Sequence, residues 1–145
     1  MPYWERNTII LGLGSLIGGT YYVVMVLIQS MAIGAVAPPS LFTFISYLVL
    51  QIAISAIGVS VSTAQASRRG ELAGLPGGMD ERDTMVKTKS EAGFGHLLSA
   101  VMFLALAAWF VHHNANLLFH SVVVGLVIGE LGRAVIQLVN YRRGD

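Results

Sequence analysis

Residues Thr8 to Ile28 read TIILGLGSLIGGTYYVVMVLI, a run of apolar and small residues without a formal charge. The uncharged stretch is longer still, because no Asp, Glu, Lys or Arg occurs from Asn7 to Ser67. A helix needs about 20 mostly apolar residues to cross the roughly 30 Å hydrocarbon core of a bilayer. This part of the chain is therefore predicted to hold two membrane spans.

A second uncharged stretch runs from Ala92 to Gly129. Over the 145 residues, only 12% are charged and 54% are hydrophobic, whereas soluble domains carry roughly 25% charged residues. The chain is therefore predicted to be a single integral membrane domain, residues 1–145. Its four spans are expected at about residues 7–31, 40–64, 94–112 and 116–139, with a central loop at 65–93.

One short turn joins the two spans in each half of the chain. Pro38 and Pro39 interrupt the first apolar run, because proline cannot donate the backbone hydrogen bond that a continuing helix needs. The second turn is expected at residues 113–116. Ala35-Val36-Ala37 resembles a signal-peptide cleavage site, but the preceding apolar run is longer than a typical signal. The first span is therefore expected to be retained.

The basic residues indicate the orientation of the spans. Eight of the nine flank the predicted spans on one side: Arg6, Arg68, Arg69, Arg82, Lys87, Lys89, Arg142 and Arg143. Positive residues accumulate in cytoplasmic loops. The sequence thus predicts an all-α, four-helix transmembrane bundle with the central loop and both termini in the cytoplasm.

The most distinctive local sequence is MDERDTMVKTKS, residues 79–90. Acidic residues followed by lysines suit the dipole of a helix that begins near Asp80. One interpretation is a solvated helix leading into the third span, and the other is a docking surface for a protein partner. The predicted partner-binding residues are Asp80, Glu81, Arg82, Asp83, Lys87 and Lys89.

Asp80-Glu81-Arg82-Asp83, followed by Val86, Lys89 and Ser90, resembles a motif of small bacterial four-span membrane proteins of unknown function. Their central loop carries Asp-Glu-Arg-Asp, an aliphatic residue and Lys-Ala/Ser. Some similar proteins accompany helix-turn-helix or LytTR-type regulators. The resemblance therefore implies a bacterial inner-membrane protein that sequesters a transcription regulator.

Glu130 and Arg133 fall inside the fourth predicted span, three residues apart and on one helical face. Ionisable residues inside a membrane are candidates for proton or substrate binding. The alternative is an intramembrane ion pair that neutralises itself, with Gln137 extending the same face. Polar residues of the second span, including Gln51, are expected mainly to join helices.

Small residues four apart predict close helix contacts: Gly14 with Gly18 and Gly125 with Gly129. The sequence leaves open whether these faces contact another helix of the chain or a second copy, so a homo-oligomer is a further hypothesis.

Histidines near the outer end of the last two spans, His112, His113 and His120, are weak candidates for a metal or haem site, and no metal is predicted. The chain has no cysteine, and no nucleophile-base set, phosphate-binding loop or long basic tract is visible. We therefore expect no enzymatic activity, no cofactor and no direct binding of nucleic acid.

Two functions follow from these residues. The leading hypothesis is a non-enzymatic accessory or regulatory protein whose charged central loop binds a partner, either a transcription regulator or a larger membrane complex. The alternative is a small proton-coupled transporter that uses Glu130 as its titrating group.

Overall fold

The computed structural model describes residues 3–70 and 81–143, and in these residues the chain forms four long α-helices. They are α1 (Tyr3–Ile33), α2 (Leu41–Arg68), α3 (Glu81–His112) and α4 (Ala115–Arg143). Each is long and apolar enough to cross a membrane. The predicted all-α four-helix bundle is confirmed. All four helices extend beyond the predicted spans at the end that carries the termini, and α3 extends furthest, beginning at Glu81 rather than near residue 94.

The two short turns are built by residues that suit helix ends. α1 ends before Gly34, whose φ of +67° is readily adopted by glycine. Ser40 then caps α2, because its side chain accepts a hydrogen bond from the Thr43 amide at 3.3 Å. In the second turn, the Asn114 side chain accepts from the Leu117 amide at 3.1 Å and starts α4.

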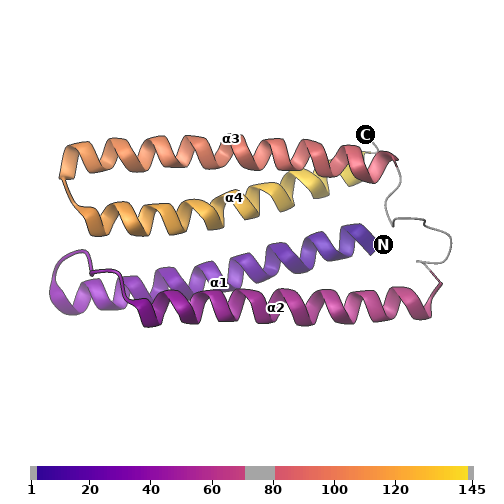
Figure 1. The fold of residues 1–145 in the computed structure, drawn as a ribbon, viewed down its shortest axis with the longest axis horizontal. Coiled ribbons are helices and arrows are strands. Elements are labelled where there is room, and N and C mark those ends of the chain that lie inside the picture. The colour runs from indigo at the N-terminus through magenta and orange to yellow at the C-terminus, as the bar shows by residue number, and fades with distance from the viewer. Residues whose placement is uncertain (1–2, 71–80, 144–145) are drawn as a thin grey trace.

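The helices form two antiparallel hairpins, α1 with α2 and α3 with α4 (Figure 1). The start of α1, the end of α2, the start of α3 and the end of α4 lie together, and we call this the charged end. The opposite end, with residues 34–40 and 113–114, is the turn end. An arrangement of this kind puts both termini on the same side of a membrane.

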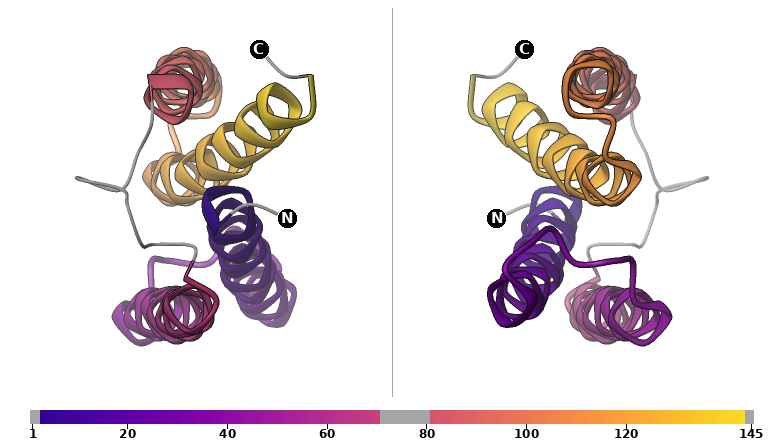
Figure 2. Two further views of the ribbon diagram at one scale, coloured as in Figure 1. Left: turned by 90° about the vertical axis from the view of Figure 1, so that its right-hand side faces the viewer. Right: turned by 90° about the vertical axis from the view of Figure 1, so that its left-hand side faces the viewer.

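The hairpins join through α1 and α4. Viewed along the bundle, these two helices lie between α2 and α3, which occupy the outside (Figure 2). α1 packs against α2 and α4, and α3 packs against α4. Across the described helices, α2 and α3 form no comparable contact. One side of the α1–α4 pair is consequently left open between the outer helices.

Glycines form the contacts within each hairpin. A Cβ atom at Gly18 would lie 2.7 Å from Gln51 Oε1 on α2, and one at Gly14 would lie 3.3 Å from Ser55 Oγ. On α4, a Cβ at Gly125 or Gly129 would come within 2.8 Å of α3 side chains. The two glycine pairs singled out in the sequence therefore face helices of the same chain.

A different pair of glycines forms the contact between the hairpins. Gly12 faces Ala134 of α4, where a Cβ atom at the glycine would lie 3.0 Å from the alanine Cβ, and Gly19 faces Val127 at still closer range. Gly12 and Gly19 are seven residues apart, which is two helical turns, so both point to the same neighbour. The glycine-rich α1 thus contacts two helices at once.

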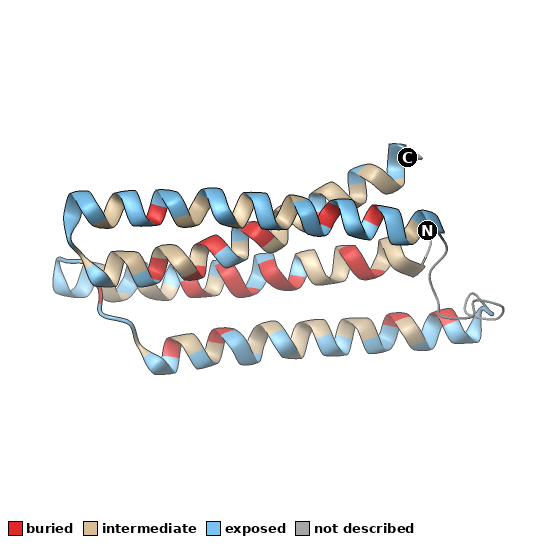
Figure 3. Ribbon diagram, turned by 45° about the horizontal axis from the view of Figure 1, so that its top comes forward, coloured by how far each residue is buried: buried red, intermediate tan, exposed pale blue. Residues whose placement is uncertain are grey.

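The inner helices α1 and α4 are more buried than the outer helices α2 and α3 (Figure 3). In the apolar windows of α1 and α4, 28% and 22% of residues are buried inside the protein, against 6% in each outer helix. Large apolar side chains such as Phe103 and Phe110 are exposed on α3. Exposed apolar faces of this kind are stable in hydrocarbon but not in water, which agrees with four membrane-crossing helices.

Replacing Gly19 by leucine should separate the hairpins, because the new side chain would overlap Val127. We expect a loss of about 1 to 3 kcal/mol in the free energy of unfolding, measured by denaturant titration in mild detergent. Gly95→Leu is the matched control, since a Cβ at Gly95 meets nothing within 4 Å. Equal stability of the two variants would contradict the α1–α4 contact.

Candidate functional site

The charged segment of the sequence begins α3 and continues directly into its membrane-crossing part. The uncharged portion of α3, from Ala92 to His112, is about 31 Å long, which matches the hydrocarbon core. The turns from Glu81 to Glu91 therefore extend beyond it as the same helix. Asp80, the predicted cap, lies outside the described residues.

The two faces of this extension differ. Val86 and Ser90 are almost completely buried, whereas Glu81, Met85 and Lys89 are exposed. The exposed three are spaced by four residues and form a stripe along the helix. We call Glu81, Met85 and Lys89 the exposed stripe. It is one part of the motif that a partner could reach, alongside the exposed Arg82 and Lys87.

Other predicted partner-binding residues have different surroundings. The Arg82 guanidinium donates to the Tyr141 carbonyl of α4 at 3.1 Å, which ties the start of α3 to the end of α4. Asp83 is partly buried and interacts within the protein. Lys87 points away from the exposed stripe and lies 3.8 Å from Glu91, a pair that is half exposed and therefore weak.

Lys87 lines a groove on the open side of the bundle, near the charged end. The groove has a volume of about 280 Å³ and takes residues from all four helices. We call it the Lys87 groove; its main lining residues are Trp4, Asn7, Val59, Lys87, Arg133 and Gln137. Asn7 is 7% exposed, and its Oδ1 has no hydrogen-bond partner among the described residues.

Glu130 and Arg133 form the ion pair that their spacing allows. Arg133 Nε and Nη2 donate to Glu130 Oε2 at 3.0 and 2.6 Å. The Glu130 side chain is 38% exposed and the Arg133 side chain is 29% exposed. Thr8 and Gln137 lie beside the pair. Each charge therefore has a partner, which lowers the cost of placing it within a membrane.

Further polar side chains continue toward the turn end. Gln51 Nε2 donates to Ser15 Oγ at 2.8 Å, while Gln51 Oε1 is buried without a partner within residues 3–70 and 81–143. Tyr47 lies one turn away on α2, and its ring packs 5.5 Å from that of Tyr22.

A buried hydrogen-bond network holds the turn end together. Tyr22 Oη lies 2.7 Å from His120 Nδ1, and His120 Nε2 lies 2.9 Å from the Ala37 carbonyl oxygen. A carbonyl can only accept, so Nε2 carries a hydrogen. In the neutral ring, Nδ1 then accepts from the Tyr22 hydroxyl. The network connects α1, α4 and the first turn.

The histidines therefore do not form one cluster. His120 is buried, whereas His112 and His113 are exposed in and beside the second turn. His113 has a φ of 51° and packs edge-on against Trp109. Among the described residues, no group of three or more potential ligands could hold a metal ion.

Comparisons of the chain with protein-family models, curated proteins and solved structures give no match. The geometry of the described residues is thus the basis for a function. Neither Tyr22 nor Asn7 was among the site residues predicted from the sequence. Both are polar groups in an apolar run, and that signal alone could have marked them as network or groove residues.

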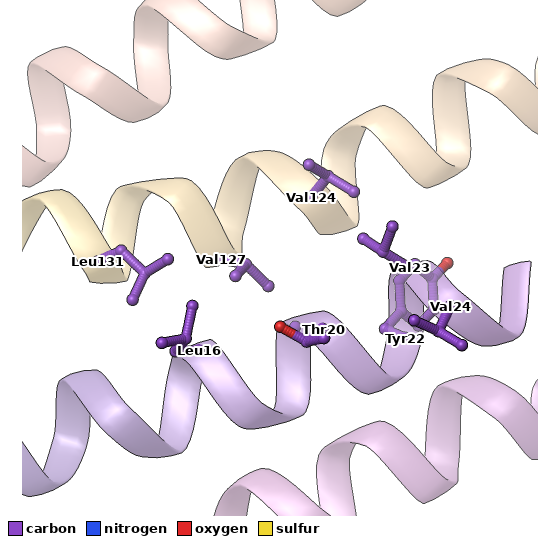
Figure 4. Close-up of a pocket in the computed structure, with 9 residues that line it drawn as sticks. Leu16, Thr20, Tyr22, Val23, Val24, Val124, Val127 and Leu131 are labelled. Carbon is purple, nitrogen blue, oxygen red and sulfur yellow. The ribbon is translucent and has the colours of Figure 1, made fainter. Parts of the chain in front are cut away.

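An apolar furrow along α1 and α4 contrasts with the polar sites described above. It has a volume of about 250 Å³ and is lined mostly by aliphatic side chains such as Leu16, Val127 and Leu131 (Figure 4). Thr20 and Tyr22 contribute the hydroxyl oxygens drawn in Figure 4. The lining has no charged residue, and the Tyr22 hydroxyl is already bound to His120, so this surface is suited to lipid chains rather than to chemistry.

His120→Ala should destabilise the bundle by about 1 to 2 kcal/mol, because it leaves the Tyr22 hydroxyl and the Ala37 carbonyl without partners. The measurement is denaturant unfolding in detergent. His112→Ala removes an exposed histidine from the same end and should have no measurable effect. Equal stability of both variants would show that the network contributes nothing.

Proposed function

We propose that this protein is a non-enzymatic accessory or regulatory protein of a bacterial inner membrane, with both termini in the cytoplasm. In this proposal it binds a cytoplasmic or membrane partner through the exposed stripe of α3. The orientation rests on the eight basic residues at the charged end. The partner is either a transcription regulator or a subunit of a larger membrane complex.

The observation that supports this proposal most directly is the continuity of α3. Glu81, Met85 and Lys89 belong to the same helix as the membrane-crossing segment, so their spacing is fixed before a partner arrives. A preformed surface loses less conformational entropy on binding than a flexible loop does. An acidic and a basic side chain flanking an apolar one also provide both charge complementarity and buried area.

Reversing the charges of the exposed stripe should abolish partner binding. The Glu81→Lys, Lys89→Glu double variant keeps the net charge but inverts the pattern, and like charges opposite a partner cost several kcal/mol. The measurement is co-purification of the tagged protein from its native membrane in mild detergent. Alanine replacement of residues 80–83 should have the same effect.

Arg143→Ala provides the control, since it changes a charge at the same end on another helix. A partner that co-purifies equally with wild type and the double variant would refute the proposal. Loss with Arg143→Ala as well would indicate a nonspecific dependence on surface charge.

The alternative function, a proton-coupled transporter, has its own support. Polar side chains occur at several levels of the bundle: the Glu130–Arg133 pair, Gln51 with Ser15, and Tyr22 with His120. Intramembrane polar and ionisable side chains are candidates for proton relays. The ion pair argues against it, because the Arg133 guanidinium already binds the Glu130 carboxylate at 2.6 Å, and a charge paired within its own helix fits a structural role.

Glu130→Gln distinguishes the two functions. If the protein is an accessory protein, the variant should keep full partner binding, and liposomes containing wild type should show no proton flux above protein-free liposomes. A pH-sensitive dye inside the liposomes gives the flux. Proton flux with wild type that disappears in Glu130→Gln would favour transport and contradict the accessory function.

A further inference from the structure

The Lys87 groove combines features that a purely structural packing defect would not need. It is open between α2 and α3, and it places Lys87 and Arg133 beside the buried amide of Asn7. Glu130 neutralises Arg133, whereas Lys87 has only a weak, half-exposed partner in Glu91, so the Lys87 ammonium is the cation of the groove lining that remains available to a ligand. The groove is therefore suited to a singly charged anion.

The depth of the groove limits what that anion can be. Tyr3 and Trp4 line it at the charged end, where aromatic side chains mark the boundary between headgroups and hydrocarbon. Leu11 and Val59 line it on the apolar side. A ligand here would have a charged part level with the aromatic residues and an apolar part that continues into the membrane.

Asn7 places a second requirement on the ligand. Its Oδ1 is buried, can only accept, and has no partner within the described residues. A phosphodiester has no proton to donate to it, but a headgroup hydroxyl does. Buried acceptors are normally satisfied, so the ligand should carry a hydroxyl close to its phosphate.

We propose that the Lys87 groove binds the headgroup of an anionic, hydroxyl-bearing phospholipid, of which phosphatidylglycerol is the simplest example. The phosphate contacts Lys87 and the guanidinium hydrogens of Arg133 that Glu130 does not use. A glycerol hydroxyl donates to Asn7 Oδ1. Basic pockets between membrane helices on the cytoplasmic side bind anionic headgroups in this way.

The volume agrees with a headgroup rather than a whole molecule. At about 280 Å³, the groove is slightly smaller than the roughly 300 Å³ at which pockets for drug-sized ligands begin. The acyl chains would lie outside it, along the open side of the bundle. A lipid seated here would contact both outer helices, which share no comparable interface in the described residues. This inference is independent of partner binding by the exposed stripe.

Native mass spectrometry of the delipidated, detergent-purified protein tests the proposal with lipids of identical acyl chains. Phosphatidylglycerol should bind more tightly than zwitterionic phosphatidylethanolamine or phosphatidylcholine. Lys87→Gln should weaken phosphatidylglycerol binding roughly five- to tenfold, the effect expected for one lost cationic contact. Lys89→Gln removes the same charge two residues away, outside the groove, and should leave binding unchanged.

Phosphatidylmethanol isolates the role of Asn7, because it has the same charge as phosphatidylglycerol but no headgroup hydroxyl. Wild type should prefer phosphatidylglycerol, and Asn7→Leu should remove that preference while still binding both lipids. The retained binding also shows that the variant is folded.

Three results would overturn the proposal. The first is equal binding of anionic and zwitterionic lipids by wild type. The second is equal loss of binding in Lys87→Gln and Lys89→Gln, which would indicate diffuse attraction to the charged end. The third is displacement of the lipid by soluble glycerol phosphate, which would make a free phosphate compound the ligand.

Discussion

The packing of α1 against α4 is the contact on which the rest of the structure depends, because α2 packs on α1 and α3 packs on α4. Gly12 and Gly19 allow that approach. Membrane helices gain little from the hydrophobic effect among themselves, so close van der Waals contact at small residues supplies much of their association. If α1 and α4 moved apart, the Lys87 groove and the Tyr22–His120 bond would both lose their geometry.

The same arrangement explains why polar side chains gather on one side. α2 and α3 lie outside and apart (Figure 2), and the Lys87 groove takes residues from all four helices. Helices of 28 to 32 residues exceed the hydrocarbon thickness. Their excess length lies largely at the charged end, and there it supplies Trp4, Lys87 and the exposed stripe. The bundle thus holds its ionisable groups where water and lipid headgroups are available.

Hydropathy predicted the number of spans, and prolines and polar turn residues predicted the breaks, because lipid imposes these constraints on single segments. The partners of the helices could not be predicted in this way. Gly14 and Gly18 indicate a close contact but not its occupant, which is α2. Gly12 and Gly19 were not predicted because their spacing is two turns. His120 was grouped with His112 and His113 by depth, whereas the rotation of α4 directs it to Tyr22. The groove draws on all four helices, so no local pattern revealed it.

A photo-crosslinking amino acid at Met85 gives the most direct test of the binding surface, because Met85 is exposed between Glu81 and Lys89 on one face of α3. Irradiation of native membranes should give one discrete protein adduct, and the adduct should vanish when the charges of Glu81 and Lys89 are reversed. The same probe at Leu104, on the lipid-facing part of α3, should give none. An adduct that survives the charge reversal, or no protein adduct from Met85, would contradict partner binding at the exposed stripe.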